Sequence, residues 1–126
     1  MSDDAIRWDD KYRKRENSQV PKPDPFLIDH LELFKPDQRV VDLASGRGRH
    51  SLLLAAQGCY VIPIDCSRIA LHRSTSEAKV RGLVIHPIVA DLTDFRLPSQ
   101  SLDAIICFNF LNRELSENIC DALVPG

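Results

Sequence analysis

The segment from residue 39 to residue 67, RVVDLASGRGRHSLLLAAQGCYVIPIDCS, constrains the fold of this chain more than any other part of the sequence. Val40, Val41 and Leu43 form a short apolar run with β-branched side chains, which predicts a strand. Gly46 and Gly48 break that run, and residues 51–57 have the composition of a helix. The segment therefore predicts a strand, a tight turn and a helix in direct succession.

The turn between this strand and this helix has the properties of a binding site for an anionic or strongly polar group. The first N–H groups of a helix have no intrahelical partner, and the helix dipole is positive at that end. Glycine lacks a Cβ, so Gly46 and Gly48 allow positive φ and a close approach of a ligand. A second apolar run, Cys59–Ile64, ends at Asp65, where a ribose would present its hydroxyl groups. A purely structural turn is the alternative, but the acid at the second strand end favours a nucleotide-type cofactor.

The spacing of the glycines narrows the kind of cofactor. A dinucleotide site has the pattern GxGxxG, whose third glycine allows close packing of the helix on the strand, and this chain has Ser51 at that position. No GK[ST] sequence follows the turn, so the phosphate-binding lysine loop of ATP and GTP sites is absent. A nicotinamide oxidoreductase is therefore a distant alternative.

The motifs DLASGRGRHSLLLA and IDCS resemble motifs I and II of class I S-adenosylmethionine-dependent methyltransferases, nearest to the small tellurite-resistance and thiopurine-type enzymes. The resemblance implies that S-adenosylmethionine is the cofactor and that Asp65 holds its ribose. The neighbouring Cys66 is also assigned to the cofactor-binding residues. The residues that would hold the methionine part are Asp42, Ala44, Gly46 and Gly48.

Two later segments fit the same plan. The apolar run Leu83–Ala90 predicts a third strand that ends at Asp91, and Ala104–Phe108 predicts a fourth. By resemblance, Asp91 would accept a hydrogen bond from the adenine amino group, and Leu92 would lie beside the ring.

The carboxyl end of the fourth strand is expected to face both cofactor and acceptor, because ligands bind outside the carboxyl ends of parallel strands. Phe108 is assigned to the cofactor-binding residues, and Asn109 and Arg113 are assigned to the substrate-binding residues. Core packing is the alternative for Phe108, and an exposed helix start is the alternative for Arg113.

Trp8 and Tyr12 lie four residues apart in a charged segment, as on one face of a helix. In the resembling enzymes a WDxxY segment folds over the cofactor and closes the acceptor pocket, so both aromatics are assigned to the substrate site; an amphipathic helix packed on the body is the alternative. Residues 1–25 are expected to form a helical cap and connector. Residues 26–126 are expected to form the cofactor-binding domain, which would begin with a helix over residues 26–34.

Composition restricts the partners. The formal charge is −2, so no basic excess favours a nucleic acid or a membrane surface. The four cysteines lack CxxC or other metal-ligand spacing, which predicts no metal site, and no catalytic residue can be assigned from spacing. His50 is expected on the surface of its helix. Neither a leader nor an apolar run near 18 residues is present, and we expect a cytoplasmic protein.

The resemblance implies an α/β, Rossmann-like methyltransferase fold with three αβα layers and parallel strands in the order 3-2-1-4. Resembling enzymes continue through further strands, so the C-terminal strands are expected to be missing here, after a helix over residues 114–123. The fourth strand would then be an unpaired edge, which favours a homodimer through it. Two functions are open: methyl transfer to a small-molecule acceptor, and a non-catalytic remnant that binds S-adenosylmethionine or a protein partner.

Overall fold

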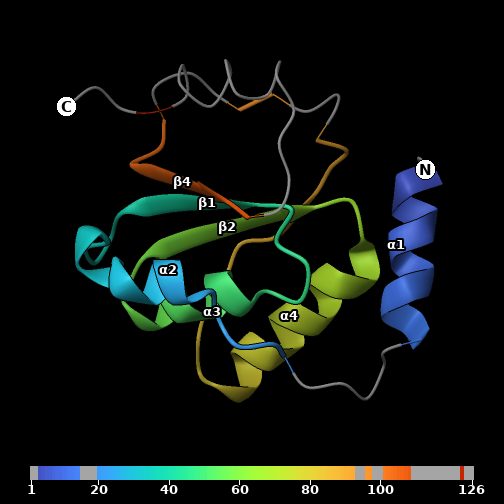
Figure 1. The fold of residues 1–126 in the computed structure, drawn as a ribbon, viewed down its shortest axis with the longest axis horizontal. Helices are drawn as coiled ribbons and strands as arrows, with labels where there is room; N and C mark the ends of the chain where they lie inside the picture. Colours follow the sequence, from blue (N-terminus) through green and yellow to red (C-terminus); the bar gives the residue numbers. More distant parts are fainter. Residues whose placement is uncertain (1–2, 15–19, 93–95, 98–100, 109–122, 124–126) are drawn as a thin grey trace.

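The computed structural model describes residues 3–14, 20–92, 96–97, 101–108 and 123. Within these residues four strands form one parallel sheet in the order β3-β2-β1-β4 (Figure 1). The strands are β1 (Arg39–Leu43), β2 (Tyr60–Asp65), β3 (Ile88–Val89) and β4 (Ala104–Cys107). The predicted strand order and parallel direction are confirmed. Asn109, Arg113 and all but the last residue of the helix predicted over residues 114–123 lie outside the described residues.

Helices cover one side of the sheet. In Figure 1, α2, α3 and α4 lie on the same side, and α1 stands beside α4, with which it is in contact. The helices are α1 (Asp3–Lys14), α2 (Pro25–Asp29), α3 (Arg49–Ala56) and α4 (Arg68–Val80), and a 3₁₀ turn, η1, spans Leu31–Leu33. None of the helices in the described ranges is long and apolar enough to cross a lipid bilayer.

The central strand β1 separates two apolar clusters, because successive side chains of a strand point to opposite faces. One cluster contains Val40 and the other contains Val41 and Leu43, and all three side chains are fully buried. The partners of Val40 include Leu27, Leu54, Val61 and Ile106, whereas those of Val41 and Leu43 include Ile64, Leu92, Leu97 and Leu102. Asp42 shares the face of Val40, which carries its carboxylate toward α3.

The third strand is much shorter than predicted. The apolar run over residues 83–90 gives only the two-residue strand β3, whose partners on β2 are Ile64 and Asp65. Pro63 has no N–H and cannot donate to this ladder. The hydrogen bond from His86 N to Val61 O is present, but the return bond toward β3 at Pro63 is not available. The composition of the run indicated a strand, whereas a residue on the neighbouring strand limited its length.

The helix predicted over residues 26–34 is also interrupted. It begins as expected, with Pro25 in the first turn and the Asp24 side chain accepting a hydrogen bond from Phe26 N at 2.8 Å. It ends at His30, whose N–H bonds to Leu27 O three residues back, and the chain continues as a 3₁₀ turn. Helix α4 was not predicted from the sequence; its signal is Ser67, whose Oγ accepts a hydrogen bond from Ala70 N at 3.1 Å.

Strand β4 has β1 as its one ladder partner among the described residues. An isolated parallel bridge joins Leu102, just before β4, to Leu123. The chain therefore returns to the β4 edge at Leu123. The predicted homodimer through this edge stays a prediction.

Candidate functional site

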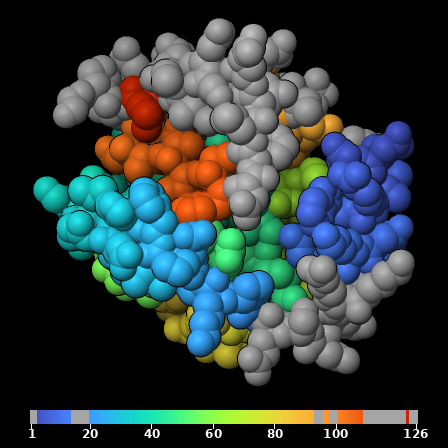
Figure 2. Space-filling model, viewed as in Figure 1, coloured from blue at the N-terminus to red at the C-terminus, as the bar shows by residue number. Residues whose placement is uncertain are grey.

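A cavity of about 300 Å³ lies at the carboxyl ends of the strands. Its wall combines the turn after β1, the ends of β2 and β4, the segment after β3, helix α1 and the connector. In Figure 2, green atoms from the middle of the chain are seen between the dark blue α1 and the lighter blue segment that follows it. The lining residues are Asp4, Trp8, Tyr12, Pro21, Asp42, Ala44, Ser45, Gly46, Arg47, Arg49, His50, Asp65, Cys66, Asp91, Leu92 and Phe108.

Every predicted site residue that the structure describes lines this cavity, with the exception of Gly48. Residues predicted to bind cofactor and residues predicted to bind substrate therefore share one cavity. Their individual roles stay predictions. Asn109 and Arg113 cannot be compared, because they lie outside the described residues.

The turn after β1 has alternating left-handed residues: φ is +54° at Ala44, +57° at Gly46 and +82° at Gly48. Backbone hydrogen bonds hold this conformation. Ser45 N donates to Ile64 O at 3.2 Å, and Gly48 N donates to Ser45 O at 3.0 Å. Because Ala44 has a Cβ, its left-handed conformation costs about 1 to 2 kcal/mol. The surrounding hydrogen bonds must offset this cost to keep the turn in place.

Gly48 does not line the cavity; its role is to allow close packing of two helices. It is the N-cap of α3, and a Cβ built on it would lie 2.7 Å from Ser74 Cβ of α4. Helix α3 and helix α4 can therefore approach this closely only where residue 48 has no side chain. The glycine turn thus joins a ligand-facing position, Gly46, to a helix-packing position two residues later.

Asp42 anchors the start of α3 to the end of β1. Its Oδ2 accepts a hydrogen bond from Ser51 Oγ at 2.7 Å, its carboxylate also accepts from the Ser51 backbone, and its exposed fraction is 2%. Burial raises the pKa of Asp42 to about 7, the bonds from Ser51 oppose this rise, and the nearby Asp65 adds to it. A proton on Asp42 is therefore gained and lost near neutral pH.

This raised pKa predicts a pH dependence of stability. The pKa of Asp42 is about 7 in the fold against 3.8 for the free side chain, so the fold holds the proton more tightly. The resulting stabilisation is complete below pH 3.8 and is lost as the pH rises through 7. Asp42→Asn cannot ionise, so we expect its free energy of unfolding to fall less than that of the wild type between about pH 5 and pH 8. Urea titrations at both pH values measure this, and parallel profiles would contradict the raised pKa.

Asp65 closes the turn from the end of β2. Its Oδ2 accepts a hydrogen bond from Gly46 N at 2.9 Å, and its Oδ1 accepts one from Ser67 N at 2.8 Å. Burial raises the pKa of Asp65, and these backbone bonds oppose the rise. The two carboxylate oxygens have about four lone-pair sites and accept backbone bonds from Gly46, Ser67 and Cys66, so Asp65 can still accept from a ligand hydroxyl while it holds the turn.

Helix α1 brings two aromatic side chains to the cavity. Trp8 and Tyr12 both line it, with ring centroids 5.9 Å apart. A Cβ built on Gly46 would lie 2.6 Å from the Tyr12 hydroxyl oxygen, so the phenol covers the turn where that turn has no side chain. Closure of an acceptor pocket by this helix and contact of either aromatic with an acceptor both stay predictions.

His50 corrects a prediction, since it is 4% exposed rather than on the helix surface. Its Nε2 accepts a hydrogen bond from Asp24 N at 3.1 Å, and its ring lies 4.2 Å from that of Phe108. Burial, with the charge of Arg49, lowers the pKa of His50 to about 4. With Nε2 as an acceptor, a neutral His50 carries its proton on Nδ1. For Phe108 the sequence left cofactor binding and core packing open. The side chain both packs against an apolar cluster and lines the cavity.

Sequence reasoning missed several lining residues. Ser45, Arg47 and Arg49 stand between or beside the named positions of the turn, so the motif could have indicated them. Asp4 and Pro21 carry no local signal, because only the fold brings α1 and the connector to the cavity. Ser45 Oγ is buried and has no hydrogen-bond partner within the described part of the chain. An unsatisfied buried hydroxyl in a cavity wall is a position for a polar ligand group.

The parallel sheet, the left-handed turn after β1 and the cavity at the strand ends define a Rossmann-like α/β domain. A family profile described as "Methyltransferase domain" matches residues 40–126. The chain belongs to this methyltransferase domain family. The predicted membership is thereby confirmed, whereas the narrower tellurite-resistance and thiopurine-type subgroup stays a prediction.

The chain is also similar to individual methyltransferases. The chain is similar to a demethylmenaquinone methyltransferase of Thermus thermophilus (34% identity, covering 65% of this chain and 39% of that protein). It is also similar to the ribosomal RNA small subunit methyltransferase B of Thermus thermophilus (33%, covering 60% and 19%). A solved S-adenosylmethionine-dependent methyltransferase from Mesorhizobium loti is 27% identical with a TM-score of 0.65, covering 74% of this chain and 45% of that chain. The chain therefore spans less than half the length of these relatives.

Proposed function

We propose that this chain binds S-adenosylmethionine in the cavity and takes part in transfer of its methyl group to a small-molecule acceptor. The observation that carries the proposal is the joint placement of the glycine turn and Asp65. The turn presents its backbone to the cavity, and Asp65 both holds that turn and lines the cavity. A ligand with ribose hydroxyls on one part and charged groups on another fits such a wall.

The charges in the wall suit the chemical groups of S-adenosylmethionine. Arg47 and Arg49 line the cavity together with the acids Asp4 and Asp42. A ligand that carries a carboxylate, an ammonium group and a sulfonium can pair with both signs of charge. The unpartnered Ser45 hydroxyl offers a further donor and acceptor in the same wall. The volume, about 300 Å³, is within the range of cofactor pockets.

When bound, S-adenosylmethionine supplies an activated methyl group. The chain's own part is then to orient the two reactants in line and to exclude water, which can supply several kcal/mol of the barrier reduction. Trp8 and Tyr12 of α1 add apolar surface to the wall that can do this. Asp65 and the turn would fix the position of the cofactor.

The acceptor that we propose is one that needs no base from His50 or Cys66. Nε2 of His50 already accepts a backbone bond, and the pKa of this side chain is lowered to about 4. Burial and the neighbouring Asp65 raise the pKa of Cys66 to about 11, so its thiol stays protonated. A soft nucleophile that is already ionised at neutral pH, such as a thiolate, or a metalloid would attack without proton transfer to the protein. The formal charge of −2 favours such a small acceptor over RNA.

Titration calorimetry of S-adenosylmethionine and S-adenosylhomocysteine into the folded chain tests this proposal. We expect both ligands to bind, and NADH to give no heat because the third glycine of a dinucleotide site is absent. Transfer of a radiolabelled methyl group to thiols, quinones or ribosomal RNA then distinguishes the acceptors. Binding without transfer to any of them would favour the non-catalytic alternative. A folded chain that binds neither ligand would reject the proposed function.

A further inference from the structure

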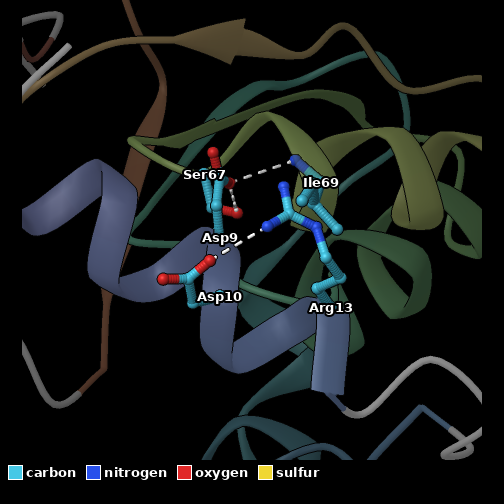
Figure 3. A network of polar contacts seen from close by, with 5 residues as sticks. All are labelled: Asp9, Asp10, Arg13, Ser67 and Ile69. Carbon is cyan, nitrogen blue, oxygen red and sulfur yellow. Dashed lines mark hydrogen bonds and ion pairs between the residues drawn. The ribbon is translucent and has the colours of Figure 1, made fainter.

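Asp9 is a buried acid on α1 that the cofactor site does not use. Its exposed fraction is 7%, whereas its neighbour Asp10 has an exposed side chain paired with Arg13 at 2.9 Å. Figure 3 shows the two acids pointing in different directions, Asp10 along its own helix and Asp9 toward Ser67 and Ile69. Burial of a carboxylate is costly unless it is hydrogen-bonded, so the partners of Asp9 matter.

The partners of Asp9 lie at the start of α4, 58 and 60 residues away in the chain. Asp9 Oδ1 accepts a hydrogen bond from Ser67 Oγ and a longer one, 3.4 Å, from Ile69 N. The same Ser67 Oγ caps α4 by accepting from Ala70 N. Asp9 therefore binds α1 to the N-terminus of α4, where a negative charge is also favoured by the helix dipole.

Ser67 connects this contact to the cofactor site. Its backbone N–H donates to Asp65 Oδ1, and the other oxygen of Asp65 accepts from Gly46 N. The hydroxyl group of Tyr12, three residues after Asp9, packs against Gly46, since a Cβ built on that glycine would lie 2.6 Å from it. The contacts thus form a closed ring from α1 through Ser67, Asp65 and Gly46 back to α1.

We propose that Asp9 is a positioning residue that locks α1 to Ser67 and thereby sets Trp8 and Tyr12 over the end of β2 that carries Asp65. This inference rests on the proposed function, since it takes the cavity to be the cofactor site. Docking of α1 and binding of the cofactor then stabilise each other, because each holds one part of the same ring. If α1 is docked in only a fraction of the molecules, the apparent affinity is the intrinsic affinity multiplied by that fraction.

The first experiment compares S-adenosylhomocysteine affinity by calorimetry in the wild type, Asp9→Ala and Asp10→Ala. Asp9→Ala is expected to weaken binding about tenfold, because the acceptor for Ser67 is lost. Asp10→Ala removes the same charge from the same helix but only an exposed pair, so its affinity should stay within about twofold. Asp9→Asn keeps an acceptor oxygen and should recover most of the affinity. Equal affinities in Asp9→Ala and Asp10→Ala would overturn the proposal.

The second experiment follows α1 directly, first without ligand and then with it. Trypsin cleavage after Lys11 and Arg13 should be faster in Asp9→Ala than in Asp10→Ala, and emission of Trp8, the single tryptophan of the chain, should change in parallel. S-adenosylhomocysteine should slow cleavage in the wild type and protect Asp9→Ala much less. Equal cleavage rates in the ligand-free variants would overturn the role of Asp9. If the wild type binds no ligand, the proposed function and the coupling to cofactor both fail, and the ligand-free rates still decide whether Asp9 holds α1.

Discussion

Asp65→Ala is expected to weaken binding of S-adenosylhomocysteine about 10- to 150-fold, the equivalent of 1.5 to 3 kcal/mol for hydrogen bonds to a charged group. Two losses act together. The ligand loses the proposed acceptor for its ribose, and Gly46 N and Ser67 N lose the acceptor that holds the turn in place. Calorimetry on wild type and variant measures the change.

The control for this prediction is Asp29→Ala, which removes the same charge from an exposed position on α2. Its affinity should equal that of the wild type, since surface charges contribute little. Urea titration of each variant checks that the fold is retained, because Asp65→Ala leaves the backbone donors of Gly46, Ser67 and Cys66 without this acceptor. Unchanged affinity in a folded Asp65→Ala protein would remove the ribose assignment.

Gly48→Ala is expected to lower the free energy of unfolding by about 2 to 5 kcal/mol, the sum of backbone strain and overpacking. The backbone of Gly48 has φ of +82°, and its added Cβ would meet Ser74 Cβ at 2.7 Å. Neither atom belongs to the end of a flexible side chain, so one of the two helices must move. Urea denaturation monitored by circular dichroism gives the value.

Gly82→Ala is the matched control for Gly48→Ala. Gly82 has a comparable φ of +69°, but a Cβ added there meets no atom within 4 Å. It should therefore cost only the backbone part, about 1 to 2 kcal/mol. The difference between the two variants isolates the contact between α3 and α4. Equal losses in the two variants would show that the helices can adjust to the added methyl group.

The relation between sequence and fold differs among the elements. Strands β1 and β2 and helix α3 were predicted to within a few residues, since apolar runs and glycines indicate where such elements begin and end. Strand β3 was predicted too long, because Pro63 on the adjacent strand limits its hydrogen bonds. The helix after the connector was predicted as continuous, but the hydrogen bonds of His30 end it after one turn.

Among the site residues too, those that depend on local sequence were predicted and those that depend on distant contacts were not. Asp42, Gly46 and Asp65 were recognised because the turn that joins them to the cavity is local in sequence. His50 was misplaced on the surface, since its burial depends on Asp24 and Phe108, which are distant in the chain. Asp9 is the acid of the WDxxY segment, yet no role was assigned to it, because its partners Ser67 and Ile69 are distant in the chain.

The amino-acid sequence by itself determined the succession of strand, glycine turn, helix and strand, together with the acid at the end of β2. It could do so because apolar periodicity and glycine spacing act over a few neighbouring residues. The tertiary structure alone decided that α1 covers the turn, that Asp9 bonds to Ser67 and that Gly48 packs against Ser74. Those contacts join residues that are far apart in the chain, and their burial and geometry exist only after the sheet and helices have packed.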